Sequence, residues 1–345
     1  MATYGNEQRA PRMVDVARLA DVSQQTVSRV VNNHANVAPE IRERVNEAIR
    51  TLRYRRNTTA RALATSRTMN IGIVSFALSV YGPSVALFGL SDAARRHGYT
   101  TSLITLEDVD TANVTSALGH LAADSVDGVI MLAPMNSAVE ALRNVTSDLP
   151  LVIFEQGTLS SPSAVAIDEV LGSQLATRHL LDLGHQTVHH VAGPRGWMAT
   201  DARIRGWERE LQIANRSVHP IQYSTDWSPN SGYEAGKTLA VDPKVTAVLV
   251  ANDSMAIGLM KAFEEANLRI PQDVSVVGFD DIAESNFTMP SLTTVQLDFA
   301  RLGRIAFERL LQLMNGEDLP PAPFISPRLI VRDSTAAVSG RGVTL

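Results

Sequence analysis

The stretch Val14-Asp-Val-Ala-Arg-Leu-Ala-Asp-Val-Ser-Gln-Gln-Thr-Val-Ser-Arg-Val-Val-Asn-Asn33 combines two short amphipathic patterns with a polar break between them. Each half has apolar residues at the i, i+3, i+4 spacing of a helix face. These residues are Val16, Leu19 and Ala20, followed by Val27, Val30 and Val31. The break at 21–23 has about the length of the turn in a helix-turn-helix. Ser23 suits the N-cap of the second helix, because its hydroxyl can accept a hydrogen bond from an early backbone N–H.

The second predicted helix has a polar outer face. With its valines facing inward, Gln24, Gln25, Ser28 and Arg29 are left outside. Gln favours adenine and Arg favours guanine in the major groove of DNA. A helical hairpin on the surface of a larger fold would have the same spacing, so the spacing alone leaves both interpretations open.

The order of residues from Asp15 to Asn32 resembles the DNA-binding head of the LacI–GalR family of bacterial transcription regulators, whose signature is roughly D-V-A-x-x-A-x-V-S-x-x-T-V-S-R-V-x-N. Two departures lie nearby: Arg12 replaces the usual capping Thr or Ser, and Asp21 replaces the usual Gly of the turn. Asp tolerates a left-handed conformation better than most residues, so the turn should survive. The resemblance implies that DNA is contacted by Ser23, Gln24, Gln25, Thr26, Ser28, Arg29 and Asn32. Within this set, Gln24, Gln25 and Arg29 would read the bases.

A third helix and a hinge are expected after this head. Pro39 suits the first turn of a helix, whose apolar face would complete a three-helix core. The stretch Tyr54 to Ala64 resembles the family's hinge, Y-x-P-N-x-x-A-R-x-L, with Arg56 in place of the usual Pro. It is too short to be a stable helix alone, so its folding should depend on DNA and a partner chain. By the resemblance, the hinge contacts to DNA are Asn57, Arg61 and Leu63, and Leu63 wedges open a base step in the minor groove.

Charge is divided unevenly along the chain. The formal net charge is −5, yet residues 1–68 hold 12 Arg, no Lys and 6 acidic residues, which gives +6. The remainder carries −11, from 19 basic and 30 acidic residues. A basic head on an acidic body is expected where only the head meets phosphate groups, although a solvated basic face would look the same.

Composition excludes several classes of protein. At 345 residues the chain should hold two or three domains. It has no Cys, so it has no disulfide, thiolate nucleophile or Cys-based zinc site. The N-terminus lacks the basic and apolar blocks of a signal peptide. The uncharged stretch Thr68 to Ser91 is interrupted by Gly82-Pro83, which marks a turn and argues against a membrane span. We therefore expect a cytoplasmic protein without membrane contact.

Short apolar runs alternate with helical patterns from Asn70 onward. This alternation predicts parallel sheets with helices on both faces. The expected strands are Ile71–Phe76, Ser102–Leu106, Gly128–Leu132, Leu151–Phe154, Val188–Val191, Val245–Val250 and Val274–Phe279. The expected helices include Val85–His97, Gly172–Leu183, Ala202–Ala214, Ser231–Ala240, Ser254–Ala266 and Phe299–Met314.

The resemblance to the LacI–GalR family extends through this α/β body. It is carried by segments such as Gly184-His185-Gln186, Asp226-Trp227-Ser228 and Val250-Ala251-Asn252-Asp253. It implies a helix-turn-helix head joined to a periplasmic-binding-protein-like core of two parallel-sheet subdomains. Crossovers are expected near 168–184, 295–299 and 326–328. The expected division is a DNA-binding domain at 1–54, a hinge helix and linker at 55–69, a sugar-binding core at 70–333 and a flexible tail at 334–345. Within the core, the N-subdomain is expected at about 70–183 and 298–326, and the C-subdomain at about 184–297 and 327–333.

Ligands of such sheets bind beyond the carboxyl ends of the strands. The resemblance implies that Arg203, Asn252 and Asp280 bind sugar hydroxyls, for which a guanidinium, an amide and a carboxylate are suitable partners. Trp227 and Phe299 would stack on the apolar face of a sugar ring. A buried Arg–Asp pair and a core Trp are the structural alternatives. The full set of expected ligand contacts is Phe76, Pro83, Pro134, Asp168, Arg203, Trp227, Asn252, Asp280 and Phe299.

Four apolar residues occupy pocket positions where a family member has polar ones: Phe76, Leu132, Leu171 and Leu297. They remove hydroxyl contacts and narrow the site, while Asp168 could restore one contact. A galactoside is therefore a plausible ligand, and another β-glycoside or a less polar sugar derivative fits as well.

Other chemistry has weak support. His185, His189 and His190 could suggest a metal, but residues 186–191 form an expected strand, whose side chains alternate between faces. Asp280 and Asp281 could suggest a glycosidase pair, yet adjacent strand-end side chains point apart and no opposing carboxylate is identifiable. The chain has no G-x-S-x-G elbow and no Walker loop. We expect no catalysis, no metal and no cofactor beyond a small-molecule sugar effector.

By the resemblance, the protein is a homodimer that binds a pseudo-palindromic operator in double-stranded DNA. The end of the chain shows no heptads of the kind that make tetramers in the family. The leading hypothesis is a repressor of a carbohydrate-utilisation operon that a sugar inducer releases from DNA. The alternatives are a transport-type sugar-binding protein, a glycoside-processing enzyme, and a regulator of the same fold with a purine or other small-molecule corepressor.

Overall fold

The computed structural model describes residues 11–31, 36–54, 67–143, 145, 148–156, 163–321 and 324–338. Contacts divide the chain into two compact units, residues 1–68 and 69–345. Each unit has its own buried core, so each is considered by itself.

The first unit is a small bundle of helices α1 (Met13–Leu19), α2 (Gln24–Val31) and α3 (Pro39–Leu52). Its core contains side chains from all three helices, which confirms the expected three-helix core; they are Val16, Ala17, Ala20, Val27, Val30, Val45 and Ala48. The expectation that Leu19 faces inward is wrong, because its side chain is 52% exposed. Ala17 takes the inward place instead, next to Val16 on the buried face of α1.

The turn between α1 and α2 has the predicted conformation. Asp21 has a left-handed φ of 51°, and Ser23 Oγ accepts a hydrogen bond from Thr26 N at 3.0 Å. The Arg44 guanidinium from α3 donates to the carbonyl of Asp21 at 2.9 Å and also to that of Ala20. These bonds satisfy carbonyl groups that the end of α1 would otherwise leave unpaired. At the start of α1, Arg12 supplies no side-chain cap, and its backbone N–H donates to Asp15 Oδ2 at 2.8 Å.

The second unit contains two six-stranded sheets. The first sheet has the order β11-β5-β4-β3-β1-β2, with all its pairs parallel. Its strands are β1 (Asn70–Phe76), β2 (Thr100–Leu106), β3 (Gly128–Leu132), β4 (Leu151–Gln156), β5 (Ala164–Ile167) and β11 (Phe324–Ile325). The second sheet has the order β12-β10-β9-β8-β6-β7 and is parallel except for the antiparallel pair β10–β12. Its strands are β6 (His189–Ala192), β7 (Gln222–Tyr223), β8 (Ala247–Val250), β9 (Ser275–Asp280), β10 (Thr293–Gln296) and β12 (Arg328–Ile330).

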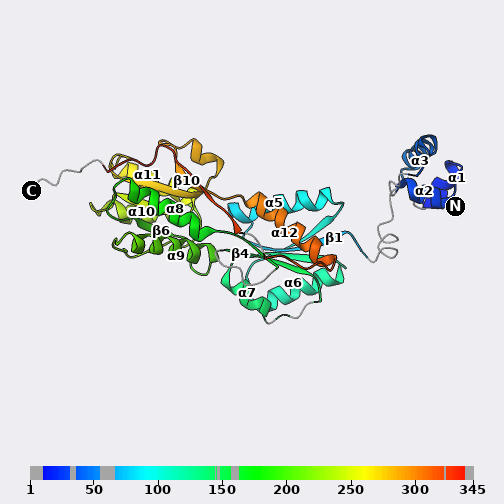
Figure 1. Cartoon of the computed structure of the whole chain (residues 1–345), viewed down its shortest axis with the longest axis horizontal. Coiled ribbons are helices and arrows are strands. Elements are labelled where there is room, and N and C mark those ends of the chain that lie inside the picture. The colour runs from blue at the N-terminus through cyan, green and yellow to red at the C-terminus, as the bar shows by residue number, and fades with distance from the viewer. Residues whose placement is uncertain are drawn as a thin grey trace, which may run out of the picture. The chain divides into compact units, whose positions relative to one another are not determined.

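Helices cover both faces of each sheet (Figure 1). On the first sheet, α5 (Tyr81–Arg96) packs beside α12 (Phe299–Met314), while α6 (Thr111–Ala123) and α7 (Asn136–Arg143) lie on the other face. Alternation along β1 explains this arrangement, because Ile71 and Ile73 join the core with α5 and α12 whereas Val74 joins the core with α6. On the second sheet, α8 (Glu169–Asp182) pairs with α9 (Met198–Ile213), and α10 (Pro229–Ala240) pairs with α11 (Asp253–Glu265).

Within the described residues, the chain passes between the two sheets at three places. These are Asp168 before α8, residues 297–298 between β10 and α12, and residues 326–327 between β11 and β12. The expected N-subdomain boundary at 183 is therefore placed too late. Because α8 packs against α9 and against strands β8, β10 and β12, it belongs with the second sheet.

The expected flexible tail does not begin at residue 334. Ser334 is fully buried; its Oγ accepts from Thr293 N at 2.8 Å and donates to the Val276 carbonyl at 2.6 Å. Further along, the N–H of Val338 donates to the carbonyl of Leu183 at 3.0 Å. Residues 334–338 are thus bonded to strands β9 and β10 of the second sheet and to the end of α8.

No helix in the described ranges is both long enough and apolar enough to cross a membrane. The uncharged stretch 68–91 contributes instead to β1, to a loop and to the first part of α5.

Candidate functional sites

The outer face of α2 is polar, as the sequence predicts. Gln24, Gln25 and Arg29 are exposed, while Val27 and Val30 are buried in the head. Ser23 and Thr26 are joined at the start of this helix by a bond between their hydroxyls at 2.9 Å. Ser28 is half-buried between the two faces. Four other expected DNA contacts, Asn32, Asn57, Arg61 and Leu63, lie outside the described residues.

Arg203 is the centre of a buried polar cluster in the second unit. Its guanidinium donates through Nε to Glu169 Oε2 at 2.6 Å, through Nη2 to Asp280 Oδ1 at 3.3 Å, and through Nη1 to the carbonyl of Ala251. The same guanidinium lies 4.1 Å from the centroid of the Phe279 ring. A guanidinium offers five N–H donors, so Arg203 keeps donors for a further acceptor.

Asp280 ends strand β9 and is buried beside Arg203. Its backbone has a φ of 105°, outside the region favoured by L-residues. Burial raises the pKa of Asp280 to about 8; Arg203 opposes this rise, while Asp253 and Glu169 add to it. A carboxyl group with this pKa can both accept and donate hydrogen bonds near neutral pH.

Asn252 follows strand β8 and is the N-cap of α11. Its Oδ1 accepts from Met255 N at 2.8 Å, and its Nδ2 donates to the carbonyl of Trp227 at 3.2 Å. Asn252 therefore joins the end of β8 to the loop that carries Trp227. That loop is held by Asp226, whose Oδ1 accepts from both Ser228 and Ser231; these bonds, Ser228 first, lower the pKa of Asp226.

Aromatic rings form a chain beside this cluster. The Trp227 ring lies 5.6 Å from the Arg203 guanidinium and meets Trp197 edge-to-face at 5.3 Å between centroids. Trp197 in turn lies 5.9 Å from Phe76. Because Phe76 ends a strand of the first sheet and Trp227 follows a strand of the second, these rings connect the two halves of the unit.

A clasp of hydrogen bonds adds to this connection. Residues 134–136 after β3 pair with residues 196–198 at the start of α9: Asn136 N donates to Gly196 O at 3.1 Å and Met198 N donates to Pro134 O at 3.2 Å. The side chain of Asn136 also donates to Asp201 Oδ2 at 2.8 Å.

Three other expected ligand residues share a small apolar cavity. Pro83, Pro134 and Phe299 line it, in the company of Gly82, Ala86, Leu132, Phe154 and Leu302. Its space of about 20 Å³ suffices for a water molecule but not for a sugar ring.

The comparisons with known proteins agree with this geometry. Residues 12–57 match the family of bacterial regulatory proteins called the lacI family, and residues 177–335 match a periplasmic binding protein-like domain. The lactose operon repressor of Escherichia coli K12 is 33% identical over 331 residues, which cover 94% of this chain and 91% of the relative. The chain belongs to the LacI family.

This LacI-family chain is similar to other repressors along almost its whole length. The HTH-type transcriptional repressor PurR of Haemophilus influenzae is 31% identical over 94% of this chain and 98% of its own. The crystal structure of the Lac repressor dimer bound to operator and the anti-inducer ONPF has a TM-score of 0.85, with 32% identity over 95% of this chain and all of that one. The protein is thus a DNA-binding, small-molecule-responsive transcriptional regulator and not an enzyme.

One expected ligand residue of the LacI-family core has a different local role. Asp168 is the N-cap of α8, and its Oδ1 accepts from Leu171 N at 2.9 Å. The neighbouring Glu169 contacts Arg203 instead. Sequence reasoning missed Glu169, although it directly follows Asp168, and also missed Trp197, which follows the Gly193-Pro194 strand end.

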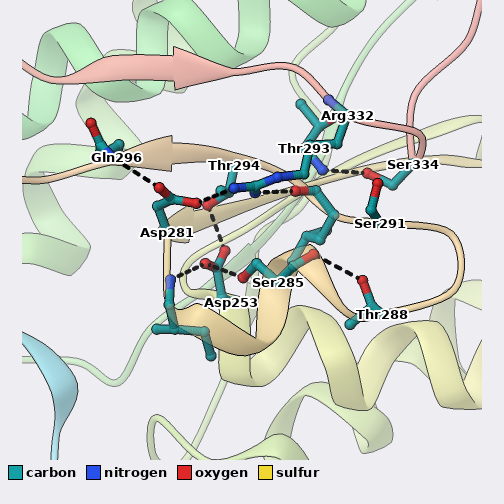
Figure 2. A network of polar contacts seen from close by, with 12 residues as sticks. Asp253, Asp281, Ser285, Thr288, Ser291, Thr293, Thr294, Gln296, Arg332 and Ser334 are labelled. Atoms are coloured by element: carbon teal, nitrogen blue, oxygen red, sulfur yellow. Dashed lines mark hydrogen bonds and ion pairs between the residues drawn. The ribbon is translucent and has the colours of Figure 1, made fainter.

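The adjacent aspartates Asp280 and Asp281 point apart, as expected. Asp281 pairs with Arg332 at 2.6 Å and accepts from Gln296 at 2.9 Å (Figure 2). Nearby, Asp253 accepts from the hydroxyls of Ser285 and Thr294, each at 2.6 Å (Figure 2). Burial raises the pKa of Asp253 to about 6.

The candidate metal histidines have structural partners. His185 bonds to Thr246 Oγ1 at 3.0 Å and to Ser275 Oγ at 3.1 Å, and His190 bonds to the carbonyl of Leu249 at 2.9 Å. His189 stacks on His219 at 4.4 Å. Across the described part of the chain, no three metal-binding side chains lie close enough to hold an ion.

Proposed function

We propose that this chain represses a carbohydrate-utilisation operon and that a galactoside or other β-glycoside releases it from its operator. The observation that carries the proposal is the buried cluster of Arg203, Asp280 and Asn252 beside the rings of Trp197 and Trp227. Charged and amide groups suit neighbouring sugar hydroxyls, and aromatic rings suit the apolar face of a sugar. The wider proposed ligand set comprises Phe76, Pro83, Pro134, Asp168 and Phe299, and the cavity that Pro83, Pro134 and Phe299 line would have to widen to admit a sugar ring.

DNA contact is assigned to the head. The exposure of Gln24, Gln25 and Arg29 supports base reading by α2, because these side chains form bidentate bonds with purine edges. Ser23, Thr26, Ser28 and Asn32 complete the assignment in the head, and Asn57, Arg61 and Leu63 complete it in the hinge.

The proposed assembly is a homodimer on a pseudo-palindromic operator. Several apolar side chains in the second unit are exposed and are candidates for the contact between subunits. They include Phe88 on α5, which is 74% exposed, and Phe287 and Met289, which are 82% and 96% exposed. The similar Lac repressor structure is a dimer bound to operator.

Release is a population shift. The sugar must bind the form of the protein that does not hold DNA more tightly than the form that does. The clasp between residues 134–136 and 196–198 is an element whose opening or closing such a ligand could favour.

Fluorescence anisotropy with a labelled symmetric palindrome that has a central CG step tests this function against a panel of β-glycosides and purines. One glycoside is expected to release the full-length protein. Asp280→Asn, which keeps the side-chain volume and replaces the carboxyl group with an amide that cannot ionise, should weaken release at least about tenfold. The exposed Asp318→Asn is the matched control and should respond like the wild type.

Other results separate the remaining possibilities. Tighter operator binding with a purine would support the corepressor alternative. Failure to bind any palindrome at low salt would contradict the assignment of the head. Release by a sugar that is unaffected by Asp280→Asn would contradict the assignment of the ligand site.

A further inference from the structure

Glu169, the first residue of α8, is fully buried and uses only half of its carboxylate. Its Oε2 accepts the hydrogen bond from Arg203 Nε at 2.6 Å. Its Oε1 has no hydrogen-bond partner among the residues that the structure describes. A buried polar atom left unpaired costs free energy, and such an atom in a native fold requires an explanation.

Two more buried polar atoms near Arg203 are in the same situation. Within the described ranges, Thr200 Oγ1 and Trp227 Nε1 also have no hydrogen-bond partner. Thr200 precedes Arg203 by about one turn of α9, and the Trp227 ring lies 5.6 Å from the guanidinium. A Cβ atom placed on Gly193 would meet both, at 2.6 Å from Thr200 Oγ1 and 2.3 Å from Trp227 Cη2. The side chains of Thr200 and Trp227 therefore both lie against Gly193, and the Trp227 ring also lies beside the guanidinium.

The pairing of carboxyl groups with Arg203 leads to the same atom. Two buried carboxyl groups, Glu169 and Asp280, contact this one guanidinium. A carboxylate that served only to balance Arg203 would place both of its oxygens on donors. Glu169 places only one of its oxygens on Arg203, so what the cluster lacks is a hydrogen-bond donor to Glu169 Oε1.

We propose that Glu169 is a ligand-binding and specificity-determining residue of the effector site, whose Oε1 accepts a hydrogen bond from one hydroxyl group of the sugar. The inference rests on the proposed function, since it takes Arg203 and Asp280 as contacts of the same ligand. A site built to bind a hydroxyl with a buried polar group strongly rejects the analogue that lacks it. Glu169 thus selects a sugar with a free hydroxyl at one ring position.

Isothermal titration calorimetry on the full-length chain tests this role. The probes are methyl β-D-galactopyranoside, methyl β-D-glucopyranoside and cellobiose, followed by the monodeoxy analogues of whichever binds. Glu169→Gln keeps an oxygen for Arg203 Nε and turns the acceptor at Oε1 into an N–H donor. Its affinity for the sugar should fall roughly 10- to 100-fold. One deoxy analogue should bind the variant and the wild type equally, as a double-mutant cycle requires.

Glu210→Gln is the matched control. Glu210 is also a buried carboxylate between α8 and α9, but it pairs with Arg178 and Gln174. The same change of charge there should leave sugar affinity within about twofold. Both variants should bind the operator like the wild type in the absence of sugar.

The outcomes distinguish this inference from the proposed function. If no probe binds the wild type, the sugar-responsive function fails and the role of Glu169 fails with it. If a sugar binds the wild type and the Glu169→Gln variant equally, the function stands and the role of Glu169 is overturned.

If the Glu169→Gln variant does not fold, measurements on the wild-type protein alone still test the inference. Methylation of the hydroxyl that contacts Glu169 should then cost as much affinity as its removal, because an ether oxygen cannot donate. If every singly altered sugar binds within about twofold of the parent, the inference is overturned.

Discussion

Asp280 is a buried acid whose proton is held unusually tightly. Its pKa rises from 3.8 to about 8, mainly because burial disfavours the charged form. An acid whose pKa is higher in the folded chain than in the unfolded chain makes its full contribution to stability at low pH. That contribution is lost as the pH rises from the unfolded pKa towards the folded one.

The contribution of Asp280 to stability should therefore decrease between about pH 4 and pH 8, against an opposing rise from buried histidines such as His190, whose pKa burial lowers to about 4. Asp280→Asn, which cannot ionise, should remove this decrease, leaving the one due to Asp253 below about pH 6. Calorimetric melting temperatures across this range measure both curves. Equal slopes for the variant and the wild type would contradict the assignment.

At the scale of single elements, α1 begins without a side-chain cap. Arg12 occupies the N-cap position, and no side-chain oxygen accepts from the first turn. Arg12→Ser should supply that acceptor and stabilise α1 by about 1 kcal/mol. Hydrogen exchange of the α1 amides in the free protein should slow correspondingly, and the amides of α12 are the internal control. Unchanged exchange in α1 would show that the Asp15 bond to Arg12 N already suffices.

The clasp between β3 and α9 is a second element with a testable role. Asn136→Ala removes the side-chain bond to Asp201 and leaves the backbone bonds in place. Because this bond joins the two halves of the second unit, its loss should accelerate hydrogen exchange in residues 133–137 and 196–201. Exchange in the helices of the head should stay the same. If exchange in the clasp is unaffected, the backbone pairing alone holds it.

Elements with strong periodicity could be predicted from the sequence, and those defined by tertiary contacts could not. The helix Phe299–Met314 was expected with its observed bounds, because its apolar stripe is continuous. Helix α6 was not expected from the sequence, because Thr111–Ala123 is rich in small residues and its faces differ little in hydrophobicity. Strands β5 and β10, each four residues long, were missed, although β6 and β8 of the same length were expected. At the ligand site, spacing could not reveal that Asp168 caps a helix while Glu169 reaches Arg203.

At the scale of the whole molecule, the two units should differ in their response to salt. Residues 1–68 carry +6 and the remainder −11, so counterion release should dominate binding by the head. Operator affinity should fall by about a thousandfold or more between roughly 50 and 200 mM salt. The affinity for a neutral sugar should change little over the same range, because its site is buried. Parallel titrations at several salt concentrations test this, and a salt-insensitive operator affinity would contradict a phosphate-binding head.

The positions of the tryptophans make intrinsic fluorescence a reporter of the ligand site. All three tryptophans, Trp197, Trp207 and Trp227, lie in the second unit. Trp197 and Trp227 meet edge-to-face beside Arg203, whereas Trp207 is fully buried and donates to the carbonyl of Val188 at 2.8 Å. Emission from the first two should respond to a bound ligand, and Trp207 should serve as a constant background. Since the head contributes no indole, any change of emission on adding operator would report directly on communication from the DNA to the ligand site.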